Sequence, residues 1–220
     1  HDLRDGISNG SPVRRMVDEL GLAGGRIVQI GIADFSNSPA YAARARQLGI
    51  HVIPRSALRD RTMADVMAEA VSIAGAAGGP VHVDFDVDVC DRSVVPACPA
   101  AAPGGISADE FRQLAFEAGR YSQVRSVDFT EIDASIDSQD GRTVRLAALG
   151  ILELAAGRLS APALHVLEGW LEYGHRLLAG AGHGIDFGAG FAVHHEQVRA
   201  LGSLPGALSV LACQIGRAHV

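Results

Sequence analysis

Three aspartates recur at every second position within residues 81–91, an otherwise apolar stretch with the sequence Val-His-Val-Asp-Phe-Asp-Val-Asp-Val-Cys-Asp. In a β-strand this spacing places Asp84, Asp86 and Asp88 on one face, with Phe85 and the valines on the other. Three like charges so close together repel one another and raise their own pKa values unless a cation lies among them. The spacing therefore predicts a site for one or two divalent metal ions.

Aspartate-rich segments are more often solvated turns than metal sites, but three features of the flanking sequence favour the metal site here. The alternating valines and phenylalanine indicate a buried strand. No glycine interrupts the run, whereas a calcium-binding EF-hand loop requires one. A loop rich in proline and glycine follows over residues 95–105, which is typical of the ordered backbone beside a site at the C-terminal end of a strand.

Composition limits the class of protein. The chain has 220 residues, of which 48% are hydrophobic, and this is enough for one sizeable α/β domain. Its net charge of −6 argues against nucleic acid or an acidic membrane as the main partner. No run reaches the roughly 18 apolar residues of a transmembrane helix. The chain has three cysteines, Cys90, Cys98 and Cys213, and they show no Cys-x-x-Cys spacing. We therefore expect no disulfide framework and no zinc knuckle, and we expect the protein to lie in the cytoplasm.

Helix and strand patterns alternate along most of the chain, so the aspartates belong to an α/β fold. The Ser107…Glu110 capping box and the Ser11-Pro12 start are the clearest helix signals. Strands that alternate with helices imply a mainly parallel sheet between two helical layers, a three-layer α/β/α architecture whose active site lies at the C-terminal ends of the strands. Asp86, Asp88 and Glu131 all fall at such ends. Helices are predicted over residues 12–20, 39–48, 62–77, 107–119 and 143–156, and strands over 26–32, 50–53, 81–91 and 124–131.

Four elements, taken together, resemble the ureohydrolase family, which comprises arginase, agmatinase and formimidoylglutamase. They are His-Asp-Leu-Arg at 1–4, Ser-Asn-Gly-Ser-Pro at 8–12, Asp-Phe-Asp-Val-Asp-x-x-Asp at 84–91 and Val-Asp-Phe-Thr-Glu at 127–131. The resemblance covers about residues 1–157 and is greatest to formimidoylglutamase. It implies an arginase-like fold, incomplete at the N-terminus, in which residues 1–160 form the C-terminal part of the domain.

The resemblance also implies a binuclear manganese hydrolase that acts on guanidines or amidines, with two Mn²⁺ ions per full-length subunit. By analogy with the family, Asp86 bridges the two metals, Asp88 binds one of them, and Asp2 is a further ligand. About half of the family's metal ligands would lie before residue 1. Glu131 matches the acid that receives the guanidinium or amidinium group of the substrate, so Asp86 and Glu131 are the candidate catalytic residues.

Departures from arginase indicate the substrate. Arg4 stands where arginases have an asparagine that contacts the substrate's α-carboxylate. Near the position of Asn9, arginases have a histidine that shuttles protons, whereas asparagine cannot titrate. An arginine favours a substrate with carboxylates, whereas agmatine, a dication, would be repelled. We therefore expect N-formimidoyl-L-glutamate to be split into L-glutamate and formamide, a step of histidine degradation. The alternatives are a guanidino hydrolase of arginase or agmatinase type that releases urea, and a catalytically inert fragment.

The remaining expectations concern partners and the end of the chain. The partner is a small-molecule substrate, with no nucleic acid and no membrane, and the family resemblance allows for a homo-oligomer. Residues 161–220 carry no resemblance, and an apolar helix is plausible there only over residues 163–178. The final Ile-Gly-Arg-Ala-His-Val is similar to a translated sequencing adapter, so the tail is interpreted as a segment of uncertain order, open to a frameshift or an artefact.

Overall fold

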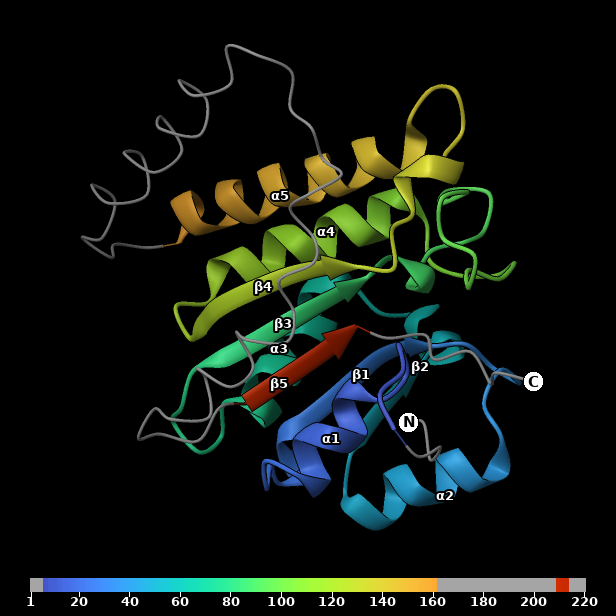
Figure 1. Ribbon diagram of the computed structural model, residues 1–220. Coiled ribbons are helices and arrows are strands. Elements are labelled where there is room, and N and C mark those ends of the chain that lie inside the picture. The colour runs from blue at the N-terminus through green and yellow to red at the C-terminus, as the bar shows by residue number, and fades with distance from the viewer. Residues whose placement is uncertain (1–5, 162–208, 214–220) are drawn as a thin grey trace.

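Five parallel strands form a single sheet in the computed structural model, which describes residues 6–161 and 209–213 (Figure 1). The strand order is β2-β1-β5-β3-β4. The strands comprise β1 (Ile27–Ile32), β2 (His51–Pro54), β3 (Val81–Asp86), β4 (Val124–Thr130) and β5 (Ser209–Cys213). Because all neighbours pair in parallel, the loops that follow β1, β3 and β4 lie at the same edge of the sheet.

Helices cover both faces of this sheet, which confirms the predicted α/β/α layering (Figure 1). One face packs against α3 (Met63–Ala74), α4 (Ala108–Arg120) and α5 (Arg142–Ser160). The other face, next to β1, packs against α1 (Pro12–Asp18) and α2 (Pro39–Leu48). None of the helices within the described residues is long and apolar enough to cross a membrane.

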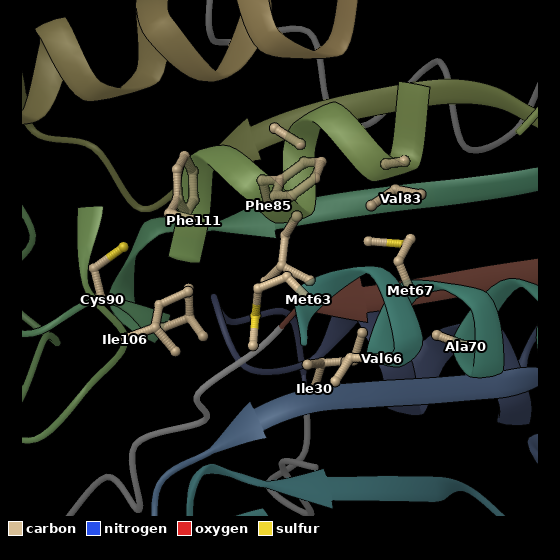
Figure 2. Packing of buried hydrophobic residues seen from close by; sticks show 14 of the residues in the cluster. Ile30, Met63, Val66, Met67, Ala70, Val83, Phe85, Cys90, Ile106 and Phe111 are labelled. Atoms are coloured by element: carbon tan, nitrogen blue, oxygen red, sulfur yellow. The ribbon is translucent and has the colours of Figure 1, made fainter. Parts of the chain in front are cut away.

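Aromatic side chains anchor the main core between β3, β4 and α4. Phe85 and Phe111 are completely buried and meet edge to face with ring centroids 5.6 Å apart (Figure 2). Phe129 stacks on Phe85 from the neighbouring strand at 5.1 Å. Full burial of a side chain of this size contributes about 1.5–3 kcal/mol. The apolar face of β3 is therefore fixed against the helices, so its aspartates must point to the opposite face.

The predicted capping signals have mixed outcomes. The capping box of α4 is confirmed, since the Ser107 hydroxyl accepts the Glu110 N–H while the Glu110 carboxylate accepts the Ser107 N–H. The Ser11-Pro12 start is confirmed, because α1 begins at Pro12, but the Ser11 side chain does not cap the helix. Its hydroxyl donates to the Ser8 carbonyl at 2.8 Å and accepts the Ser8 N–H at 3.0 Å, and it makes no hydrogen bond to the helix N–H groups of α1.

Two features of the strands differ from the sequence-based prediction. The aspartate strand ends at Asp86, and residues Val87–Val89 form a 3-10 turn instead of continuing to residue 91. The alternation of aspartates with apolar residues persists beyond the end of the strand, so periodicity could not reveal this end. Strand β5 was not predicted, and the helix expected over residues 163–178 lies outside the described residues.

Candidate active site

Asp86 and Asp88 lie together at the C-terminal end of β3, but not in the common strand register that their spacing predicted. Asp86 is the last residue of the strand, and its Oδ1 accepts the Asp88 N–H at 3.0 Å. This hydrogen bond caps the 3-10 turn, so Asp88 is carried by the turn and not by the strand. Both residues are buried, with exposed fractions of 6% for Asp86 and 3% for Asp88.

The electrostatics of this pair disfavour two free negative charges. Burial raises the pKa of Asp86 well above its ordinary value, and the charges of Asp88 and Asp84 raise it further, while the Asp88 N–H lowers it. The charge of Glu131 adds to the same rise. Burying carboxylates close to one another costs free energy, so this group of negative charges is suited to a bound cation.

The donor chemistry of the pair fits manganese as part of a larger ligand set. Carboxylate oxygens are hard donors of the kind that suit Mn²⁺. Within residues 6–161, however, no three His, Cys, Asp or Glu side chains converge closely enough to enclose an ion. The expected ligand Asp2 and the expected substrate contact Arg4 lie outside the described residues.

Glu131 follows β4 directly and reaches the same edge of the sheet. The β3–β4 register pairs Asp86 with Thr130, so Glu131 begins the loop beside the end of β3. Its φ of 63° places this residue in the left-handed region, which costs a residue with a Cβ about 1–2 kcal/mol. Such strain is retained where the surrounding structure holds it, often at functional sites. No sequence pattern predicted this backbone conformation of Glu131.

The loop of residues 91–105 borders the two carboxylates. Burial, together with the charges of Asp88 and Asp86, raises the pKa of Cys98 to about 12, so this buried thiol stays neutral. The loop is braced at its ends, because the Asp91 carboxylate accepts the Gly104 N–H at 2.7 Å. Inside it, the Arg92 guanidinium donates to the Cys98 carbonyl at 2.9 Å. The Pro- and Gly-rich segment is therefore ordered, as its sequence predicted.

Asp84 belongs to a separate polar cluster on the same face of the sheet. Its Oδ1 accepts the Thr130 hydroxyl at 2.8 Å. One step back along the strands, His82 lies 3.3 Å from Asp128 through Nε2 and 2.7 Å from the Ser126 hydroxyl through Nδ1. These contacts link β3 to β4 below the site. His82 thus packs in the sheet as a structural histidine.

Asn9, the other expected substrate contact, is exposed in the turn before α1. The structure thus brings Asp86, Asp88 and Glu131 to one edge of the sheet, and it leaves the roles of Asn9, Asp2 and Arg4 as predictions.

Comparison with known proteins decides the family. The model of the arginase family matches residues 1–157. This chain belongs to the arginase family. The arginase-family chain is 35% identical to a formimidoylglutamase of Halalkalibacterium halodurans over 72% of its own length and 50% of that protein. It thus spans about half the length of the curated relatives that it matches.

Solved structures agree with this family fold. The crystal structure of Bacillus subtilis formimidoylglutamase matches with a TM-score of 0.69 and 30% identity, over 74% of this chain and 52% of that one. A structure of Trypanosoma cruzi formiminoglutamase with Mn²⁺ matches with a TM-score of 0.63 and 25% identity, over 72% of this chain and 54% of that one. The arginase fold expected from the sequence is therefore confirmed.

Proposed function

We propose that the complete protein containing this chain is a manganese-dependent hydrolase of linear amidines, with N-formimidoyl-L-glutamate as its substrate. The observation that carries this proposal is the buried pair Asp86 and Asp88, at the same sheet edge as Glu131, whose charge acts on Asp86. The formimidoylglutamase relatives support the substrate. The Mn²⁺-containing relative supports the metal.

Asp86 and Asp88 would hold the manganese, together with Asp2 and ligands outside the described residues. When bound, two manganese ions supply Lewis-acid activation of water at neutral pH. Without a cation the two buried carboxylates repel each other, and this repulsion lowers the free energy of unfolding of the chain. A bound metal would therefore relieve this repulsion and supply the chemistry of the proposed function at the same place.

Glu131 would position the electrophile. Its carboxylate would accept N–H groups of the amidinium in a charge-assisted contact and hold the trigonal carbon towards Asp86 and Asp88. Arg4 would pair with a carboxylate of the glutamate part, and Asn9 would contact the same part through its neutral amide. Water then adds to the amidine carbon, the bond from that carbon to the glutamate nitrogen breaks, and a proton from water passes to that nitrogen. The products are formamide and glutamate.

This activity places the protein in histidine degradation in the cytoplasm, with a small-molecule substrate and neither nucleic acid nor membrane as partner. A homo-oligomer is the proposed assembly. The assignment of the reaction rests on the similarity to proteins named formimidoylglutamase, and the compartment and the assembly are proposed together with it.

The test is hydrolysis by the complete protein with Mn²⁺, comparing N-formimidoyl-L-glutamate, L-arginine and agmatine. We expect formamide from the first, with a kcat/KM more than about 100-fold above that for either guanidine, because a site built for two carboxylates leaves its cationic contacts unpaired with agmatine. Urea release from arginine or agmatine as the main activity would instead identify a guanidino hydrolase. Release of neither product would contradict the enzyme proposal.

A further inference from the structure

One residue of the loop beside the carboxylates is held from two sides by segments distant in sequence. Ala97 is completely buried, and its N–H donates to the Thr143 hydroxyl at 3.0 Å. Its carbonyl accepts the Asp133 N–H at 3.0 Å. Asp133 lies two residues after Glu131, and Ala97 immediately precedes Cys98. A single residue therefore joins the loop bearing Cys98 to the loop bearing Glu131.

Thr143, the partner of Ala97, is itself oriented by Asp137. Its hydroxyl donates to Asp137 Oδ1 at 2.9 Å, and a hydroxyl has only one proton to donate. The Asp137 carboxylate thus leaves a lone pair of the Thr143 oxygen for the Ala97 N–H. Partial burial raises the pKa of Asp137, but hydrogen bonds from the Val144 N–H and from Thr143 outweigh this, and the net shift is downward. Asp137 remains ionised at neutral pH and can only accept.

Helix capping alone does not explain this arrangement. The N-cap residue before α5 is Gly141, which has no side chain, and Asp137 replaces the missing cap by accepting the N–H groups of Thr143 and Val144, each at 3.1 Å. That cap needs no hydroxyl at position 143. The Thr143 side chain is fully buried and points away from its own helix. Its hydroxyl accepts the buried Ala97 N–H of the loop beside Asp86 and Asp88.

We propose that Thr143 and Asp137 are positioning residues that hold the Cys98 loop and the Glu131 loop in register with Asp86 and Asp88. They act through Ala97 and touch no reacting group. Without the Thr143 hydroxyl, the Ala97 N–H would be buried and unsatisfied, so the loop would open to let water reach it. The catalytic consequence rests on the proposed function, whereas the structural consequence does not.

The first test measures alkylation of Cys98 and Cys90 in the native 220-residue chain, with mass spectrometry to locate the label. Both thiols are buried, so labelling reports local opening. We expect Thr143→Val to raise the labelling rate of Cys98 by about tenfold with little change at Cys90, and Asp137→Asn to raise it several-fold. Thr143→Ser keeps the hydroxyl and should restore the original rate. Thr62→Val, which removes the cap of α3, is the matched control and should leave Cys98 unchanged.

The second test is kinetic and uses the complete protein with Mn²⁺ and N-formimidoyl-L-glutamate. Thr143→Val should lower kcat about tenfold with a smaller change in KM, and Thr143→Ser should restore it. Equal labelling of Cys98 in Thr143→Val and the unaltered chain, or an equal rise at Cys90 and Cys98, would overturn the inference. If no variant, nor the unaltered protein, hydrolyses any amidine, the proposed function fails, and the labelling still decides the role of Thr143.

Discussion

At Asp88, the needs of folding and of function oppose each other. Its charge helps raise the pKa of Asp86, and both side chains are buried. We predict that Asp88→Asn increases the free energy of unfolding of the metal-free chain by about 1–2 kcal/mol, because it removes a buried like charge. Urea unfolding with a chelator at pH 7.5 would measure this. The exposed Asp60→Asn is the control, and a less stable Asp88→Asn variant would contradict the prediction.

Glu131 allows backbone strain to be separated from the loss of its carboxylate. Glu131→Ala and Glu131→Gly both remove the acid, but only glycine adopts a φ of 63° without strain. The glycine variant should therefore be more stable than the alanine variant by about 1 kcal/mol in urea unfolding. Both should lose amidine hydrolysis in the complete protein. Equal stabilities would mean that this backbone is not strained.

The His82 cluster predicts how stability depends on pH. Burial lowers the pKa of His82, but its hydrogen bond to Asp128 and the charges of Asp128 and Asp84 outweigh this, so the pKa is raised. Burial and the charge of Asp128 raise the pKa of Asp84 to about 7. Groups with raised folded-state pKa values contribute stability that is full below their unfolded values and is lost as pH rises through the folded values.

The free energy of unfolding should therefore fall as pH rises from about 4 to about 7, between the ordinary and the folded pKa of Asp84, and His82→Gln should reduce the part of the fall that continues above about pH 6.5. Urea midpoints across this range provide the measurement, with the more exposed His51→Gln as control. A slope unchanged in His82→Gln, or stability that rises with pH, would show that this cluster does not titrate as described.

At the scale of elements, α4 and α5 approach closely at two glycines. A Cβ at Gly157 would lie 1.9 Å from the Phe116 carbonyl oxygen, and one at Gly119 would lie 2.1 Å from the Leu154 carbonyl oxygen. Gly157→Ala should cost about 2 kcal/mol, because overpacking outweighs the gain in helix propensity. Gly25→Ala, with nothing within 4 Å of its Cβ, is the control. A Gly157→Ala variant as stable as this control would mean that the helices can separate at no cost.

Local signals predicted most elements but not their exact ends. The Ser107–Glu110 capping box fixed the start of α4, because its hydrogen bonds join residues three apart. The end of β3 could not be read in the same way. The strand ends because the Asp86 carboxylate accepts the Asp88 N–H, and this N–H is then not paired with a neighbouring strand. The alternation of polar and apolar residues continues beyond this point, so the sequence pattern does not reveal the end.

At the scale of the whole molecule, the layering was predictable and the strand order was not. Alternating strands and helices imply a parallel sheet between helices in any α/β chain. The place of β5 between β1 and β3 depends on pairing between segments more than 100 residues apart, which no local pattern encodes. The candidate site was likewise predictable only in part. Asp86, Asp88 and Glu131 stand at strand ends, whereas the Ala97 contacts with Thr143 and Asp133 appear only in three dimensions.

The most direct measurement is formamide release from N-formimidoyl-L-glutamate by the complete protein, with manganese removed by a chelator and then returned. Asp86→Asn is compared with the unaltered protein, because Asp86 lies at the centre of the buried charge. We predict that chelation abolishes activity, that Mn²⁺ restores it in the unaltered protein, and that Asp86→Asn stays at least about 100-fold below it. Activity that survives chelation, or full manganese-restored activity in Asp86→Asn, would contradict the assignment of this site.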